Sequence, residues 1–181
     1  MTLTYNEGLV LVSGPVKSGK SLLAEKIALS SSSHVKYVAT HIEIDDSLEW
    51  QNRIQKHKDR RPSNWVIIEN NQLIAVLKEQ KDAATLLIDS LGGFVTFYLH
   101  YDTIYWTKLC QDLINEINLY EGLVIIVIEE VGWGVSPSTD LGNIFRDRIG
   151  ELTLLLEDIS TTSWLVFHNR ALNLSTNSIK I

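Results

Sequence analysis

The residues that most clearly point to a chemistry form one loop near the N-terminus, Gly14-Pro15-Val16-Lys17-Ser18-Gly19-Lys20-Ser21. The loop matches the phosphate-binding pattern G-x-x-x-x-G-K-[S/T] at every fixed position. In that pattern backbone N–H groups surround a polyphosphate, the lysine reaches the β- and γ-phosphates, and the last hydroxyl binds Mg²⁺. We therefore expect Ser21 to be a magnesium ligand and Lys20 to face solvent when no ligand is bound.

The sequence on both sides of this loop fits the same interpretation. An apolar run over residues 9–13 precedes the loop, and a helix-like stretch over residues 21–28 follows it. A helix that begins there would direct the positive end of its dipole at the phosphates. A glycine-rich turn that matches the pattern by chance is the alternative, and the flanking strand and helix disfavour it. The chain is predicted to bind a nucleoside triphosphate.

A second group of candidate residues lies in the basic segment 53–62, which holds five lysines and arginines together with His57. Trp50, Ile54 and His57 share one face of a predicted helix. Nearby cations favour the neutral imidazole, which is the nucleophilic form of histidine. The same cations would attract a triphosphate and stabilise charge in a phosphoryl transition state. A histidine that only packs or faces solvent is the alternative.

Carboxylates stand at the ends of two predicted buried strands. Asp89 ends one of them, where it could face Mg²⁺ or the nucleotide, or could instead cap a following helix. Glu129 and Glu130 end the other and precede a glycine-rich segment. This pair is consistent with a mobile active-site segment and equally with a solvated strand exit.

Short apolar runs alternate with amphipathic stretches along the chain. Most runs are continuous in hydrophobicity, as in parallel strands that are buried on both faces. The predicted strands are residues 9–13, 35–40, 65–69, 84–89, 123–129 and 164–167. The predicted helices lie near 19–30, 45–58, 72–80, 92–120 and 139–159, and residues 173–181 are expected to be coil or a short edge strand. This alternation predicts an α/β fold with a mainly parallel central sheet flanked by helices.

Composition restricts the class of protein. The 181 residues are predicted to form a single domain over 1–181, with 45% hydrophobic and 21% charged residues. The net charge of −6 argues against a non-specific nucleic-acid binder. A lone cysteine, Cys110, cannot form an intramolecular disulfide and is expected to be a small buried hydrophobe. No apolar run approaches membrane-spanning length, so a cytoplasmic enzyme is expected.

Several segments, taken in order, resemble one known family. They are the phosphate-binding loop, Tyr37-Val38-Ala39-Thr40, the basic segment with Trp65 and Glu69 after it, the strand that ends in Asp89, and Glu130-Val131-Gly132-Trp133-Gly134-Val135-Ser136-Pro137. Together they resemble the bifunctional adenosylcobinamide kinase / adenosylcobinamide-phosphate guanylyltransferase family of late cobalamin synthesis. The resemblance extends from about residue 9 to residue 167, and the histidine and 130–137 segments are its most specific parts.

The resemblance implies a RecA-like P-loop NTPase that phosphorylates adenosylcobinamide and then transfers GMP from GTP, through a guanylyl-histidine, to adenosylcobinamide phosphate. It implies GTP and ATP as substrates, Mg²⁺ as cofactor, a corrinoid substrate and a homotrimer. His57 matches the guanylylated histidine. Further nucleotide contacts match Ala39, Thr40, His41, Lys58, Asp59, Arg60, Arg61, Glu69 and Asp89, the last also being a candidate magnesium ligand. Relatives usually have Glu where this chain has Asp89, and a glycine-containing turn where it has His168-Asn169-Arg170.

Two other functions remain compatible with the residues alone. A different P-loop small-molecule kinase would need no nucleophilic histidine and would never carry covalent GMP. A regulatory nucleotide-binding module would bind nucleotide without turning it over.

Overall fold

The computed structural model describes residues 3–32, 34–40, 61–134 and 136–181. Within them the chain forms one sheet of seven strands in the order β3-β2-β4-β5-β1-β6-β7. The strands are β1 (Gly8–Gly14), β2 (Val35–Ala39), β3 (Val66–Glu69), β4 (Thr85–Asp89), β5 (Leu123–Glu129), β6 (Thr162–Phe167) and β7 (Arg170–Asn173). The helices are α1 (Lys20–Ser31), α3 (Leu73–Glu79), α4 (Leu91–Phe97), α5 (Thr103–Leu119), α6 (Asp140–Ile159) and α7 (Leu174–Asn177).

Strands β1 to β6 run parallel, and only β7 runs antiparallel, to β6. The central strands β1, β4 and β5 are buried almost throughout, which explains their continuous apolar sequence. The predicted α/β class and mainly parallel sheet are therefore confirmed.

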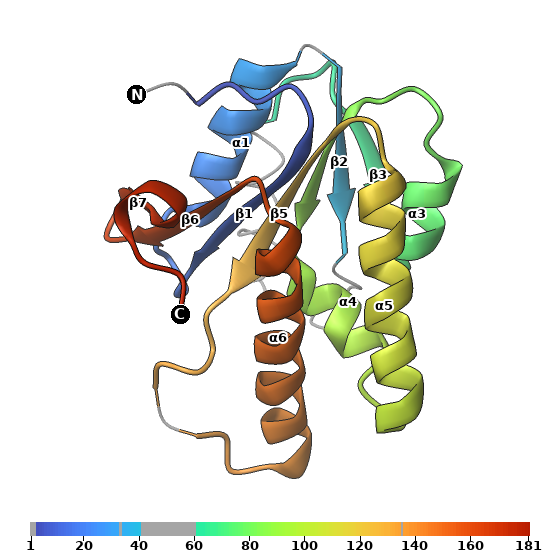
Figure 1. Cartoon of the computed structure of the whole chain (residues 1–181), viewed down its shortest axis with the longest axis vertical. Helices are drawn as coiled ribbons and strands as arrows, with labels where there is room; N and C mark the ends of the chain where they lie inside the picture. The colour runs from blue at the N-terminus through green and yellow to red at the C-terminus, as the bar shows by residue number, and fades with distance from the viewer. Residues whose placement is uncertain (1–2, 33, 41–60, 135) are drawn as a thin grey trace.

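Helices cover both faces of the sheet (Figure 1). One face packs on α1, through Val10, Val12, Tyr37, Leu87 and Trp164 of the strands and Ala24, Ile27 and Ala28 of the helix. The other face packs on α3, α4, α5 and α6, through residues of the opposite parity such as Leu11, Val38, Ile88 and Ile126. Because neighbouring residues of a strand point to opposite faces, each strand contributes to both cores.

The single helix expected near 92–120 is two helices, α4 and α5. Asp102 separates them, because its carboxylate accepts a hydrogen bond from the backbone N–H of Tyr105 at 2.8 Å and so begins a new helix. Periodicity of apolar residues continues across the break, so it did not reveal the cap. Arg148 of α6 holds the connection in place by donating to the carbonyls of Tyr98 and Leu99 at 2.8 and 3.1 Å.

The C-terminal segment 173–181, expected to be coil or a short edge strand, begins at the last residue of the edge strand β7 and contains the short helix α7. The first turn of α7 is capped by the Asn173 side chain, which accepts from the Thr176 N–H at 3.1 Å. Cys110 is buried, as expected, and its burial raises the thiol pKa to about 12. In the described part of the chain, none of the helices has the length and apolar character needed to span a bilayer. The helix expected near 45–58 lies outside the described residues.

Candidate functional site

The phosphate-binding loop connects β1 to α1 at the carboxyl end of the sheet (Figure 1). Three of its residues have positive φ: Gly14 at 154°, Lys17 at 59° and Gly19 at 100°. A Cβ on Gly14 would collide with the backbone carbonyl oxygen of Val166, so only glycine fits there. The Ser18 N–H donates to the Pro15 carbonyl at 3.2 Å and closes the turn. The loop therefore has the tight backbone path that a phosphate cradle requires.

Lys20 does not face solvent as expected, since only 9% of its surface is exposed. Its ammonium donates to the Pro15 carbonyl oxygen at 3.3 Å, at the start of the same loop. The carbonyl replaces water at the ammonium, and the aliphatic part of the side chain is covered. The charge is thus held inside the loop, where it would meet a bound phosphate.

Asp89, at the end of β4, accepts two hydrogen bonds from residues far from it in sequence. Ser21 Oγ donates to one carboxylate oxygen at 3.4 Å, and Tyr37 Oη donates to the other at 2.7 Å. Burial and the adjacent carboxylate raise the pKa of Tyr37, so the phenol keeps its proton and remains a donor. The alternative that Asp89 caps a helix is wrong, because the residue at the start of α4 is Ser90.

The Ser21 hydroxyl and the Asp89 carboxylate fit a magnesium ion. Both offer oxygen, the ligand atom that Mg²⁺ prefers, and Mg²⁺ commonly takes only one or two protein groups besides substrate phosphates and water. Among the described residues, no group of three or more His, Cys, Asp or Glu side chains is suited to a metal ion.

The ends of β3, β2 and β4 form a row next to this pair. Ala39 is the register partner of both Glu69 and Asp89, so the three residues lie side by side on neighbouring parallel strands. Glu69 is exposed at the outer strand. Arg61 reaches the same part of the site, because its guanidinium lies 3.5 Å from the centroid of the Tyr37 ring. Arg61 Nε is buried and has no hydrogen-bond partner among the described residues.

Thr40 is buried directly after this row. Its hydroxyl donates to the Ser90 carbonyl at 2.6 Å and accepts from the Ser90 N–H at 3.0 Å. It therefore ties the end of β2 to the residue that follows Asp89 and helps to fix the position of the Asp89 carboxylate.

The two glutamates that follow β5 have different roles. The Glu129 carboxylate accepts from Ser90 Oγ and from the Gly92 N–H, the latter at 3.0 Å, and so caps α4. Glu129 is half-buried and its carboxylate holds the start of a helix. The Glu130 N–H donates to the Gly14 carbonyl at 3.2 Å. Burial raises the pKa of Glu130, although a hydrogen bond from Ser13 and the charge of Lys20 oppose the shift.

The turn between β6 and β7 also belongs to the site, and the sequence interpretation missed it. His168 and Asn169 have φ values of 50° and 57°, which identify a two-residue turn of the type that joins twisted strands. The Asn169 N–H donates to the Ser18 carbonyl of the loop at 2.9 Å. The signal was present, because asparagine tolerates positive φ and this chain has no glycine there.

Five of the expected site residues, His41, His57, Lys58, Asp59 and Arg60, lie outside the described residues. All the others lie at the carboxyl end of the sheet or in the loop after β1, and Arg61 places the end of the basic segment at the same edge.

A sequence model of the family described as cobinamide kinase / cobinamide phosphate guanyltransferase matches residues 10–174. This range includes the loop, the row of strand ends and the β6–β7 turn. The chain belongs to this family. Two curated relatives agree with the assignment. The bifunctional adenosylcobalamin biosynthesis protein CobP of Pseudomonas aeruginosa is 33% identical over 154 residues, covering 78% of this chain and 83% of the relative. CobU of Escherichia coli is 30% identical over 174 residues, covering 87% and 94%.

Solved structures place this member of the cobinamide kinase family in a broader fold. A KaiC-like protein from Pyrococcus horikoshii aligns with a TM-score of 0.51 over 87% of this chain and 70% of its own, at 14% identity. Another protein of that organism, from a structural study of project PH0250, aligns with a TM-score of 0.55 over 96% and 87%, also at 14% identity. These proteins share the expected α/β fold, with a mainly parallel central sheet flanked by helices.

Proposed function

We propose that the chain is a bifunctional enzyme that phosphorylates adenosylcobinamide and then converts the product to adenosylcobinamide-GDP. The observation that carries the proposal is the phosphate-binding loop with Lys20 held inside it and the Ser21–Asp89 pair beside it, in a chain that belongs to the cobinamide kinase family. Both reactions need a triphosphate held in one cradle.

In the kinase step, the aminopropanol hydroxyl of adenosylcobinamide attacks the γ-phosphorus of GTP or ATP. The bond from that phosphorus to the bridging oxygen breaks, the hydroxyl proton passes to solvent, and a nucleoside diphosphate leaves. Backbone N–H groups of the loop and Lys20 bind the phosphate oxygens and stabilise their developing charge. Magnesium held by Ser21 and Asp89 would add positive charge at the same oxygens.

In the guanylyl step, a nitrogen of the His57 imidazole attacks the α-phosphorus of GTP, and pyrophosphate leaves. A phosphate oxygen of adenosylcobinamide phosphate then attacks the same phosphorus, the phosphorus–nitrogen bond breaks, and the imidazole is restored. Lys58, Arg60 and Arg61 supply cations for the phosphoryl oxygens. Arg61 Nε is buried and has no hydrogen-bond partner in the described part of the chain, which supports this role, because such an N–H favours binding an anionic oxygen.

Covalent labelling tests the guanylyl step. Protein incubated with α-labelled GTP and Mg²⁺ should acquire acid-labile label, and mass spectrometry should place GMP on His57. The His57→Asn variant should lose the label and guanylyl transfer but keep nucleotide binding. His100→Asn, at an exposed position between α4 and α5, is the matched control and should label normally. Labelling of another residue would refute the role of His57, and a wild-type chain that phosphorylates a small molecule without covalent GMP would be a simple P-loop kinase.

Family resemblance also leads us to propose a homotrimer. Sedimentation velocity of the purified protein should give a single species of three times the 20.5 kDa chain mass. A monomer at the concentrations used for activity would contradict this part of the proposal.

A further inference from the structure

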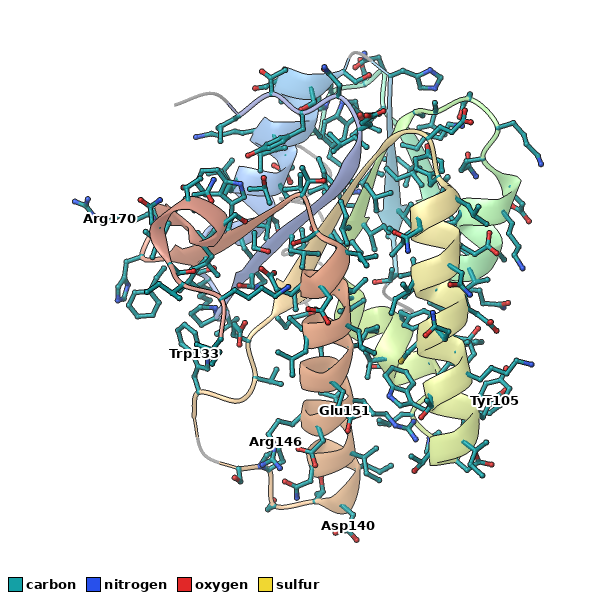
Figure 2. All side chains as sticks on the ribbon, in the orientation of Figure 1. Tyr105, Trp133, Asp140, Arg146, Glu151 and Arg170 are labelled. Atoms are coloured by element: carbon teal, nitrogen blue, oxygen red, sulfur yellow. The ribbon has the colours of Figure 1, made fainter. Side chains whose placement is uncertain are left out.

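Two large aromatic side chains beside the phosphate-binding loop are exposed, and neither has a role in the reactions described above. Trp133, in the segment after β5, is 58% exposed and Phe167, at the end of β6, is 47% exposed. Their ring centroids are 6.3 Å apart, and the His168 ring lies edge-on to Phe167 at 4.0 Å. Figure 2 shows Trp133 extending from the loop after β5 near the β6–β7 end of the sheet. We call Trp133, Phe167 and His168 the aromatic platform.

The platform is joined to the phosphate-binding loop through the residue that follows it. Asn169 donates its N–H to the Ser18 carbonyl, and a Cβ on Gly19 would lie 2.6 Å from Asn169 Oδ1. Trp133 follows β5, and Phe167 is the last residue of β6. These two strands pair with β1 on its two sides. The platform therefore lies beside the phosphate-binding loop, on the β6 side of β1.

The chemistry of the platform suits a nucleobase. Aromatic rings stack on any base, because every base presents a π-face, and such stacking does not select among bases. The row that contains Glu69 and Asp89 can instead select one base, because carboxylates accept hydrogen bonds from the N1–H and amino group of guanine. In the sheet order that row lies at β3-β2-β4, on the other side of β1 from β6. One cradle thus has two unlike surfaces next to it.

We propose that the aromatic platform binds the base of the nucleotide used in the kinase step, as a second base position distinct from the carboxylate row. This inference rests on the proposed function, in which one loop holds the triphosphate for both reactions. In the kinase step only the γ-phosphorus reacts, so a surface that holds either purine is sufficient. In the guanylyl step the α-phosphorus must reach His57, whose segment lies in the sequence between β2 and β3.

Binding measurements with Trp133→Ala and Phe167→Ala test the platform. Calorimetry would give the Kd of non-hydrolysable ATP and GTP analogues and of inorganic triphosphate, which has no base. For each variant, we expect the Kd of the ATP analogue to rise about tenfold and the Kd of triphosphate to stay unchanged. The Kd of the GTP analogue should rise less, because guanine can still bind at the carboxylate row. Trp133→Phe, which keeps a ring, should restore analogue binding. Tyr105→Ala removes an exposed ring on α5 and is the matched control, with no expected change. Unchanged analogue affinity in both alanine variants would overturn the proposal.

Kinetics then separate the two base positions. The KM for triphosphate in the kinase reaction should rise in Trp133→Ala, while GTP-dependent labelling of His57 should keep its rate. If Trp133→Ala weakened the kinase reaction and the labelling of His57 equally, the proposal of a second base position would be overturned. Unchanged analogue affinity together with dissociation of the oligomer, or with loss of corrinoid binding, would assign the rings to those partners and also refute the proposal. Absence of covalent GMP in the wild type would refute the guanylyl step but leave the binding test of the platform decisive.

Discussion

At the scale of single residues, the site places charges where water cannot fully screen them. Lys20 is buried against the Pro15 carbonyl, and Glu130 is half-buried nearby, with its pKa raised mainly by burial. The Asp89 carboxylate accepts hydrogen bonds from the Tyr37 and Ser21 hydroxyls. The fold thus keeps a cation ready for phosphate, and the cost of holding it inside the loop is offset when the anion binds.

The role of Lys20 can be tested with two variants. Lys20→Ala and Lys20→Met should each reduce kinase turnover and GTP-dependent labelling by at least about a hundredfold, because a preorganised charge at the phosphates is lost. The methionine variant keeps an aliphatic chain of similar length, so it separates loss of charge from loss of packing. Lys26→Ala, at an exposed position of the same helix α1, is the control. Full labelling by Lys20→Met would show that the phosphates bind elsewhere.

The raised pKa of Glu130 predicts that the free energy of unfolding depends on pH. Because its pKa is raised above the ordinary 4.5, the folded chain binds the proton more tightly than the unfolded chain, and the free energy of unfolding should fall as pH rises just above 4.5. Glu130→Gln should remove this decrease, so the variant should be more stable than the parent at neutral pH and no different well below pH 4.5.

Urea denaturation as a function of pH measures this effect. Glu121→Gln, at an exposed position before β5, is the control and should leave the profile unchanged. A lower stability of Glu130→Gln at neutral pH would mean that the attraction between Glu130 and Lys20 outweighs the burial of the carboxylate.

At the scale of elements, the ends of strands and helices are held by groups from other elements. The N-terminus of α4 is capped by Glu129 of β5, and Thr40, after β2, bonds to both backbone groups of Ser90. Gly93 of α4 allows this approach, because a Cβ there would collide with the Thr40 hydroxyl and carbonyl. The ends of β2, β4 and β5 are therefore joined into one unit through the first turn of α4.

Two helical glycines test this close approach. Gly93→Ala should lower the free energy of unfolding by about 1–3 kcal/mol, because the methyl group has no room against Thr40. Gly150→Ala, in α6, meets nothing within 4 Å and should raise it by about 0.5–1 kcal/mol through helix propensity. Thermal or urea denaturation of both variants gives the comparison. Equal effects would mean that the contact between α4 and Thr40 is loose.

At the scale of the whole molecule, the parallel sheet brings its strand ends together at one edge, as ligand sites of open α/β sheets require. Ala39, Glu69 and Asp89 are separated by tens of residues in sequence but are register partners there. The loop after β1 lies between this row and the β6–β7 turn in the order of the sheet. A triphosphate in the cradle can therefore meet carboxylates on one side.

This arrangement predicts selectivity for guanine in the guanylyl step. Adenine has an acceptor where guanine has the N1–H, so it would leave a carboxylate unpaired at a cost of about 1–3 kcal/mol. Competition should show GTP preferred over ATP for histidine labelling, with the preference reduced in Glu69→Gln and Asp89→Asn. Equal labelling by ATP in the parent would refute guanine recognition by these residues. Loss of metal dependence in Asp89→Asn without a change in base preference would make Asp89 a magnesium ligand alone.

The sequence by itself determined the features that depend on neighbouring residues. The phosphate-binding loop is contiguous, and its glycines specify the backbone path locally. The buried strands are continuous apolar runs, so all six expected strands end within one residue of the observed end and β5 matches at both ends. The α/β class follows from the alternation of these runs with amphipathic stretches.

Only the tertiary structure decided which distant residues meet. The split between α4 and α5 depends on the Asp102 cap, and the role of Glu129 depends on α4 starting beside β5. The hydrogen bonds of Tyr37 and Ser21 to Asp89, like the contact of Asn169 with Ser18, join elements that are remote in sequence. The burial of Lys20 involves a contact within its own loop, but it also appeared only in the folded structure. Such contacts follow from strand order and register, which are set by packing of the whole sheet and leave no periodic signal in the sequence.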